Sequence, residues 1–257
     1  MNRPIALLTD FGHCDWFVAS MKGVILSVNP GAVIVDINHN IPASGIPAAA
    51  FNLLACHSSF PKCTIFVAVV DPGVGSSRAA IAAKAGPYFL LGPDNGVLSP
   101  VIDNYYKPEL RALLNPKYFL RKVSATFHGR DIFAPAAAHL SKGVAFEKLG
   151  PRIKDIVRLS MPLACEKGKQ IAGSVMYIDH FGNAITNIPS SLVSRRINHV
   201  FVKGHKIPLR SCYADVGKGK PLAVAGSCGF AEVSVNKGNA AKKMKLKIGD
   251  KVEIANK

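Results

Sequence analysis

Residues 63–78 read CTIFVAVVDPGVGSSR, and this stretch decides the fold expected for the chain. Its continuous apolar run is typical of a strand buried on both faces of a parallel sheet. The run stops at Asp71, where a proline and two glycines follow as a turn, and Arg78 closes the stretch. We therefore expect a buried strand that carries a carboxylate into a glycine-rich turn, with a guanidinium shortly after it.

The residues before this strand alternate between strand and helix patterns. Segments 4–10 and 32–38 read as short buried strands. Between them, the apolar residues of 17–28 recur at helical spacing, with Asp15 placed to cap the helix start, and 44–56 forms a second helical stretch. The β-α-β-α-β order predicts an α/β fold: a mostly parallel sheet with helices on both faces.

Three later segments extend this pattern. Segments 79–84 and 87–96 predict strands that can pair as a hairpin. Segment 129–143 predicts a helix with Pro135 in its first turns. All three segments therefore belong to the same N-terminal α/β domain, which we expect to span residues 1–160.

The pattern changes after about residue 160. Residues 158–170 read as a linker, and short strands and turns follow with almost no helical periodicity. The pair Gly249–Asp250 stands between two β-like runs and predicts a hairpin. We expect a smaller, all-β, barrel-like C-terminal domain over residues 168–257.

The composition of the chain indicates which class of protein it belongs to. The chain has 257 residues, 49% apolar and 19% charged, which indicates a globular protein. No apolar run approaches the ~18 residues of a membrane helix, and Asp10 interrupts the N-terminal apolar run, so we expect a cytoplasmic protein without membrane attachment. The six cysteines lack the spacing of a zinc site, and we expect no metal.

The net charge of +16 raises the question of nucleic-acid binding. Aromatic residues are sparse around the lysine-rich segments, so the sequence shows no platform on which bases would stack. A solvated basic surface explains the charge better, and a nucleic-acid partner is not expected.

Polar residues follow four of the predicted strands. They are Asp10, the pair Asp36 and His39, the pair Asp71 and Arg78, and the pair Asp94 and Asn95. Ligands of open parallel sheets bind beyond the carboxyl ends of the strands. Each cluster alone also suits an ordinary turn, but four together favour a site.

His128 lies in TFHGRDIF, directly before a glycine at a helix start. A single histidine there is usually structural, but together with an Asp and an Arg from a strand end it can position and polarise a water. The chain has no G-x-S-x-G, H-E-x-x-H or Walker sequence, which argues against a serine hydrolase, a zinc protease or a P-loop enzyme.

The C-terminal half offers two further polar clusters. Asp179, Phe181 and Asn183 surround one glycine, and they suit either an ordinary hairpin loop or the binding of an amino-acid zwitterion or a base. Ser227 and Glu232 are likewise explained equally well by a turn and by a site.

Seven spaced motifs, taken together, resemble the S-adenosyl-L-methionine (SAM) hydrolases, the adenosine-forming SAM hydroxide adenosyltransferase family related to SAM-dependent fluorinase and chlorinase. The resemblance runs over nearly the whole chain. The motifs are LLTDFG…DWFVASMKGVI, VDINHNI, VAVVDPGVGSSR, LGPDNGVL, TFHGRDIFAP, IDHFGNAITNI and EVSVNKGNAA.

The resemblance implies an α/β domain joined to a barrel-like domain, in a homotrimer that binds SAM between neighbouring subunits. SAM would be the substrate, with no cofactor and no metal. Asp71, Arg78 and His128 match the set that holds the attacking water in the hydrolases. Asp10 matches the carboxylate that grips the ribose diol.

The C-terminal residues are carried over in the same way. Asp179, Phe181 and Asn183 match the loop that holds the methionine part and stacks on the base. Ser227 and the backbone at Ala240 match further contacts. The sequence GSCG at 226–229 departs from the family's usual Asn-Ser-x-Gly.

Two alternatives remain beside SAM hydrolysis. Halide-dependent SAM cleavage is disfavoured, because the related fluorinase has a tyrosine where Asp71 stands and a carboxylate repels a halide. The other alternative is a non-catalytic protein that binds SAM, adenosine or nucleic acid, and only the net charge supports its nucleic-acid form.

Overall fold

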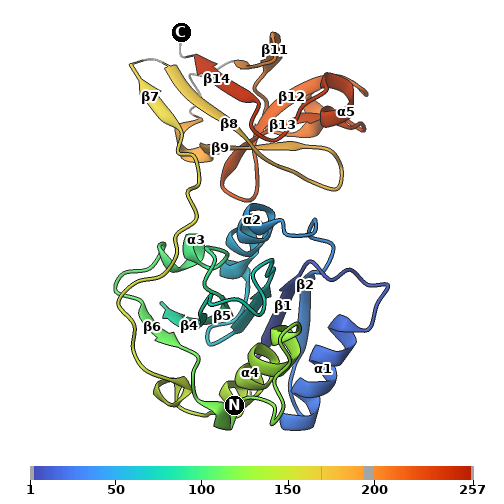
Figure 1. Ribbon diagram of the computed structural model, residues 1–257. Helices are drawn as coiled ribbons and strands as arrows, with labels where there is room; N and C mark the ends of the chain where they lie inside the picture. The colour runs from blue at the N-terminus through green and yellow to red at the C-terminus, as the bar shows by residue number, and fades with distance from the viewer. Residues whose placement is uncertain (1–2, 169, 194–198, 256–257) are drawn as a thin grey trace. The chain divides into compact units, whose positions relative to one another are not determined.

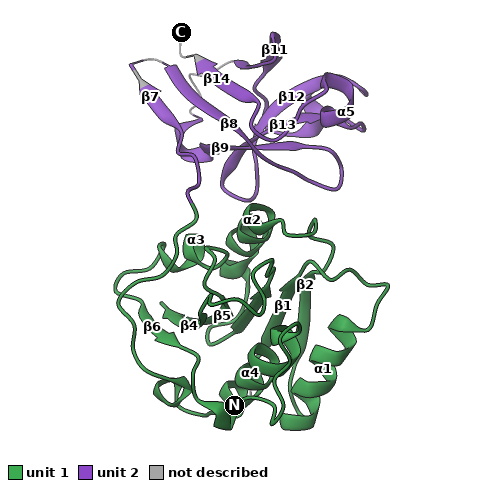
Figure 2. Cartoon of the chain, in the orientation of Figure 1, with its two compact units in different colours: residues 1–159 green, residues 160–257 purple. Residues whose placement is uncertain are grey.

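The computed structural model describes residues 3–168, 170–193 and 199–255. The chain divides into two compact units, residues 1–159 and 160–257, which are coloured separately in Figure 2. Within the described ranges, no helix has both the length and the apolar character needed to cross a membrane.

The first unit is built on one six-stranded sheet with the order β2-β1-β3-β5-β4-β6 (Figure 1). β1, β2, β3 and β5 run parallel to one another, whereas β4 pairs antiparallel with both β5 and β6. The predicted α/β fold and its hairpin are therefore confirmed. The strands are β1 (Ile5–Thr9), β2 (Ile34–Asn38), β3 (Ile65–Val69), β4 (Ala80–Ala85), β5 (Tyr88–Pro93) and β6 (Glu109–Ala112).

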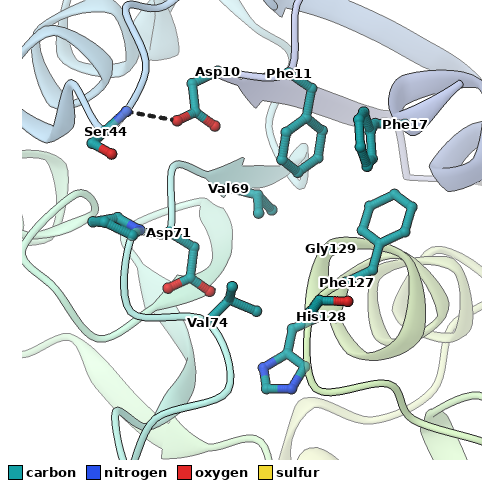
Figure 3. Close-up of a pocket in the computed structure, with 12 residues that line it drawn as sticks. Asp10, Phe11, Phe17, Ser44, Val69, Asp71, Val74, Phe127, His128 and Gly129 are labelled. Carbon is teal, nitrogen blue, oxygen red and sulfur yellow. Dashed lines mark hydrogen bonds between the residues drawn. The ribbon is translucent and has the colours of Figure 1, made fainter. Parts of the chain in front are cut away.

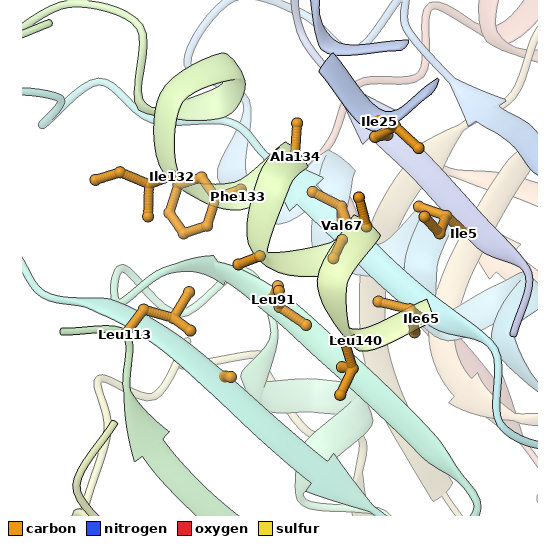
Figure 4. Packing of buried hydrophobic residues seen from close by; sticks show 14 of the residues in the cluster. Ile5, Ile25, Ile65, Val67, Leu91, Leu113, Ile132, Phe133, Ala134 and Leu140 are labelled. Atoms are coloured by element: carbon orange, nitrogen blue, oxygen red, sulfur yellow. The ribbon is translucent and has the colours of Figure 1, made fainter. Parts of the chain in front are cut away.

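Successive side chains of a strand point to opposite faces of the sheet. The strands therefore present apolar side chains on both faces, and helices cover both. Ile5 and Ile65 belong to the apolar cluster that contains residues of α1 and α4 (Figure 4), whereas Ala6 and Phe66 belong to the cluster that contains residues of α2 and α3. Each large aliphatic side chain buried there contributes about 1.5–3 kcal/mol. The helices are α1 (Phe17–Val28), α2 (Ile46–Cys56), α3 (Ser99–Ile102) and α4 (Ala134–Ser141).

Two local details differ from the sequence prediction. The residue that precedes α1 is Trp16, and Asp15 provides no side-chain cap, so that prediction is wrong. The expected helix over 129–143 begins as a π-helical turn, Gly129–Phe133, before α4 takes over with Pro135 in its first turn. Such π-turns are rare and are found mostly at functional sites.

The second unit is an eight-stranded antiparallel sheet with the order β11-β10-β14-β8-β9-β13-β12, and β7 pairs with β8. A bridge between Leu209 and Ala223 joins the two ends of this order, so the barrel is nearly closed. The predicted barrel-like unit is confirmed. The strands are β7 (Cys165–Lys167), β8 (Gln170–Ile178), β9 (Ala184–Pro189), β10 (His199–Val202), β11 (His205–Pro208), β12 (Pro221–Ala225), β13 (Phe230–Val235) and β14 (Lys251–Ala255).

The end of the second unit departs from the prediction. The hairpin expected at Gly249–Asp250 is wrong: this pair lies in a turn that leads into β14, which pairs with β8 and β10 instead. A short helix that the sequence did not predict, α5 (Ala240–Met244), precedes it. In the described parts of the two units there are also five 3₁₀ turns: His57–Ser59, Pro116–Tyr118, Phe146–Leu149, Ser190–Leu192 and Tyr213–Asp215.

Candidate active site

A pocket of about 330 Å³ opens beyond the carboxyl ends of β1 and β3, where the sheet places two carboxylates (Figure 3). Asp10 follows β1 and Asp71 follows β3, and both line the pocket together with His128. The remaining lining residues are Phe11, Phe17, Ser44, Val69, Pro72, Val74, Thr126, Phe127 and Gly129.

Asp71 and Arg78 form a two-pronged ion pair across the glycine-rich turn. The Arg78 Nε donates to Asp71 Oδ1 at 2.9 Å, and its Nη2 donates to Oδ2. The side chains of Asp71 and Arg78 are only 5% and 11% exposed, respectively. Such a fork-shaped pairing fixes both groups in orientation as well as in distance. The turn thus delivers a carboxylate whose position is set by an arginine in the same loop.

His128 joins this pair through the same guanidinium. The Arg78 Nη2 donates to His128 Nδ1 at 2.7 Å. Burial and the adjacent Arg78 cation lower the pKa of His128, and Asp71, Asp131 and a hydrogen bond to the Ser124 backbone oppose the shift only in part. The imidazole is therefore neutral at pH 7. Because Nδ1 accepts a hydrogen bond, the proton lies on Nε2, which is a donor.

Gly75 lets the turn pack against the loop that precedes His128. Its φ is +80°, and a Cβ built there would lie 2.4 Å from the Ala125 carbonyl oxygen. A residue with a side chain would force the two loops apart. The close approach at Gly75 therefore ties the Asp71 turn to the segment that leads to His128.

Asp10 is oriented by one hydrogen bond from the neighbouring loop. Its Oδ2 accepts from the Ser44 backbone N–H at 2.8 Å (Figure 3). One oxygen is thus fixed, and the carboxylate lines the pocket. This arrangement leaves an acceptor that suits a pair of hydroxyl groups.

The other polar strand ends serve structure instead. His39 is buried, with Nδ1 2.8 Å from Thr9 Oγ1 and Nε2 3.0 Å from Asp36 Oδ1. Asp94 accepts from the Val157 backbone, and Asn95 donates to the Val70 carbonyl. Of the four clusters, two therefore supply the pocket.

Three phenylalanines that sequence reasoning missed form one wall of the pocket. The Phe11 ring lies 5.4 Å from Phe17 and 5.7 Å from Phe127, and Phe17 lies 5.3 Å from Phe127 (Figure 3). Phe11 and Phe127 directly follow or precede predicted site residues in sequence. Aromatic residues next to predicted site residues could have indicated this wall, but ordinary core packing explains such residues equally well.

In the second unit, Asp179 and Asn183 form a closed turn. Asp179 Oδ1 accepts from the Asn183 backbone at 2.8 Å, and Oδ2 accepts from the Asn183 amide at 2.9 Å. Phe181, at the tip of this turn, is 72% exposed. A large aromatic ring held out on a rigid turn offers a surface for stacking.

Helix α5 contacts this turn through a backbone hydrogen bond. The Ala241 backbone donates to the Gly182 carbonyl at 2.8 Å, and Asn239 caps the helix by accepting from the Lys242 backbone. Ala240, the first residue of α5, is fully buried. The Ala241–Gly182 hydrogen bond thus places the start of α5 next to the Asp179–Asn183 turn.

Glu232 belongs to a buried polar group beside this turn. It is 6% exposed, and its Oε1 accepts from Tyr213 Oη at 2.7 Å and from Ser234 Oγ at 2.5 Å. Burial, followed by the hydrogen bond to Glu232, raises the pKa of Tyr213 to about 12. Tyr213, which the sequence did not single out, lines a hollow of about 410 Å³ with Phe181, Asn183, Val235, Lys237 and Gly238.

Ser227 lies apart from that hollow. It is exposed in the Gly226–Gly229 turn and does not line either pocket described here. In the described part of the chain, no group of three or more His, Cys, Asp or Glu side chains is arranged to hold a metal ion.

Comparisons with known proteins show the family of the chain. Residues 5–150 match the family model of the SAM hydroxide adenosyltransferase N-terminal domain, and residues 173–253 match that of its C-terminal domain. An (R)-S-adenosyl-L-methionine hydrolase of Thermus thermophilus is 39% identical, with 98% of this chain and 99% of the relative covered. A fluorinase of an Actinoplanes species is 28% identical over 98% and 97%.

A solved structure supports the same conclusion. The crystal structure of an uncharacterized conserved protein from Thermotoga maritima superimposes with a TM-score of 0.93 at 37% identity, covering 98% of this chain and all of that one. Both family models match within one continuous chain, and together they cover most of it. The chain belongs to the SAM hydroxide adenosyltransferase family.

Proposed function

We propose that the protein hydrolyses SAM to adenosine and L-methionine by in-line attack of water on C5′ of the ribose. The observation that carries this proposal is the Asp71–Arg78–His128 set in a pocket that also holds Asp10. Relatives from Thermus thermophilus and Salinispora arenicola, 39% and 34% identical, are named (R)-S-adenosyl-L-methionine hydrolases, which supports the same reaction.

The reaction needs few groups because the leaving group is already activated. The water oxygen forms a bond to C5′ while the C5′–S bond breaks, and the bonding electron pair neutralises the sulfonium. Methionine leaves as a neutral thioether, so no general acid is required. The protein must align the water, accept its proton and exclude other nucleophiles.

The hydrogen bonds favour Asp71 as the proton acceptor. His128 Nδ1 is engaged by Arg78, and its Nε2 carries a hydrogen. Asp71 binds Arg78 with one lone pair on each oxygen and retains others for the water. His128 then acts as a donor that orients the water oxygen, and Arg78 stabilises the developing negative charge.

We propose the remaining contacts with SAM on the basis of the family relationship. Asp10 accepts from the two ribose hydroxyls, and the Phe11–Phe17–Phe127 wall, which lines the same pocket, excludes bulk water. Asp179, Phe181 and Asn183 form the substrate surface of the second unit, and Ser227, Glu232 and the backbone at Ala240 stay predicted substrate contacts. A cytoplasmic homotrimer that binds SAM between neighbouring subunits, works without a metal and has no cofactor stays a prediction.

Oxygen labelling tests the function directly. Purified protein incubated with SAM in H₂¹⁸O and chloride-free buffer should yield adenosine that carries ¹⁸O and methionine that does not, as read by mass spectrometry. Label in homoserine, formed beside unlabelled 5′-methylthioadenosine, would exclude attack at C5′, because it marks attack on the methionine Cγ instead. A product that forms only when chloride is added, with chlorine at C5′, would favour halogenation instead. Tight SAM binding without turnover would favour a binding protein.

The pH profile should report His128. Only the neutral imidazole can accept from Arg78, and its pKa lies below the ordinary value of 6.5 because of burial and the Arg78 cation. We therefore expect kcat/KM to stay constant as the pH falls from 7 to 6.5 and to decline only below that. A profile measured at constant ionic strength checks this, and an acid limb above pH 6.5 would contradict the neutral His128.

A further inference from the structure

The loop that carries Phe127 and His128 has no regular secondary structure of its own. No helix or strand is found between Tyr118 and the π-helical turn that begins at Gly129. Two pocket residues, Thr126 and Phe127, nevertheless lie in this stretch, and His128 ends it. Something other than a helix or a strand must therefore hold the loop in place.

Asp131 supplies most of the anchoring bonds. Its side chain is fully buried, and Oδ2 accepts from the Ser124 backbone at 2.8 Å. Its carbonyl oxygen accepts from the Leu120 backbone at 2.9 Å, and its own N–H donates to the Phe127 carbonyl at 3.0 Å. One residue thus fixes the loop at both ends.

Arg130 extends this anchor to the aromatic wall. Its Nε donates to Asp131 Oδ1 at 2.6 Å, and its guanidinium lies over the Phe127 ring at 4.9 Å. Phe127 in turn packs against Phe11 and Phe17. The buried carboxylate therefore sets the guanidinium, and the guanidinium covers one face of a wall residue.

The same loop touches the Asp71 turn. Ala125, next to the anchored Ser124, makes the close approach to Gly75. Movement of the loop would disturb the Asp71 turn as well as His128. Asp131 does not line the pocket and is therefore separate from the groups that would meet substrate.

We propose that Asp131 is a positioning residue. Through Ser124 and Arg130, it holds His128 in place beside Arg78 and Asp71. The consequence for catalysis rests on the proposed SAM hydrolysis, but the positioning itself does not. Removal of the Asp131 charge would have two opposite effects on the pKa of His128. The direction in which that pKa changes therefore tests the proposal.

Arg78, Asp71 and Asp131 are the charged groups that act on His128. Loss of the Asp131 charge alone would lower the pKa of His128 further, since that anion raises it. Release of the loop would instead expose the imidazole to water and separate it from Arg78, which removes the two largest causes that lower its pKa. The hydrogen bond to the Ser124 backbone, which raises the pKa, would be lost too, but it is a smaller cause, so the pKa would rise toward 6.5. The direction of the change therefore separates positioning from a direct charge effect.

The experiment is an NMR titration of the histidine imidazoles in Asp131→Asn and in the unaltered protein. The His128 signal is assigned by its disappearance in His128→Asn. We expect the pKa of His128 to rise in Asp131→Asn, and kcat to fall about tenfold or more through loss of a charge-assisted bond. An unchanged or lower pKa would overturn the proposal.

Two further variants keep the test decisive. Asp155→Asn removes an equal charge from a side chain that is 77% exposed and pairs with Arg158, and it should leave His128 unchanged. If Asp131→Asn does not fold, Ser124→Ala replaces it, because Ser124 Oγ accepts from the Phe127 backbone at 3.0 Å and the substitution changes no charge. A smaller rise in the same direction is expected there, and no rise would again overturn the proposal.

The titration needs no substrate, so it separates this proposal from the proposed function. A protein that fails to cleave SAM but shows the upward shift would retain Asp131 as a positioning residue of a different site. A protein that cleaves SAM without the shift would retain the function and lose the positioning role.

Discussion

Asp71→Asn should lower the rate of adenosine formation by about 10²–10⁴-fold, the range typical of a lost general base. The amide keeps the size of the carboxylate but cannot take a proton from water, and it offers Arg78 only one accepting oxygen in place of two. Adenosine released at saturating SAM, measured by chromatography, gives the rate.

Asp103→Asn is the matched control for this variant. Its carboxylate is 46% exposed, pairs with Arg158 and does not line the pocket, so its rate should equal that of the unaltered protein. SAM binding by Asp71→Asn, followed by calorimetry, should persist because Asp10 and the aromatic wall remain. If Asp71→Asn turned over SAM within tenfold of normal, Asp71 would not be the base.

Arg78→Lys should cost about 10²–10³-fold in kcat, as expected for removal of a group that stabilises developing charge. Arg78 binds both oxygens of Asp71 and the Nδ1 of His128 at once. A lysine ammonium is a point charge without this planar fork, so it cannot hold three acceptors in the same geometry. Steady-state kinetics should show the loss in kcat with little change in KM.

The chain contains a matched arginine–carboxylate pair for comparison. Arg111 binds Glu109 through Nε at 2.9 Å and through Nη2, in the same unit but outside the pocket. Arg111→Lys should therefore leave kcat unchanged. Equal losses in both lysine variants would mean that Arg78 acts on the stability of the unit and not on the reaction.

Much of the fold could be predicted because a strand that is buried in a sheet needs apolar residues, and such runs are easily recognised in the sequence. The continuous apolar run before Asp71 fits a strand with both faces covered, and β3 is buried throughout. Short strands and turns with almost no helical periodicity predicted a barrel-like C-terminal unit, and the sheet observed there is nearly closed. The errors at Asp15 and Gly249–Asp250 concern single turns, where local propensity is weak and tertiary contacts decide.

The site was predicted less completely. Asp71, Arg78 and His128 were predicted because a polar residue after a buried strand or before a glycine is conspicuous, and the structure joins them through one guanidinium. Phe11 and Tyr213 could not, since an aromatic residue gives the same signal in a core as in a pocket wall. Only the three-dimensional arrangement separates those two cases.

The strand order of the first unit bears on how the protein acquires activity during synthesis. Asp71 and Arg78 flank the connection from β3 to β4, yet β4 pairs only with β5 and β6, which are translated later. A nascent chain that ends near residue 80 thus contains both members of the ion pair but lacks the strands that hold β4, and with it the end of the turn after Arg78, in the sheet. His128, which completes the proposed catalytic set, follows Arg78 by fifty residues, so the ribosome has synthesised most of the first unit before this set can assemble.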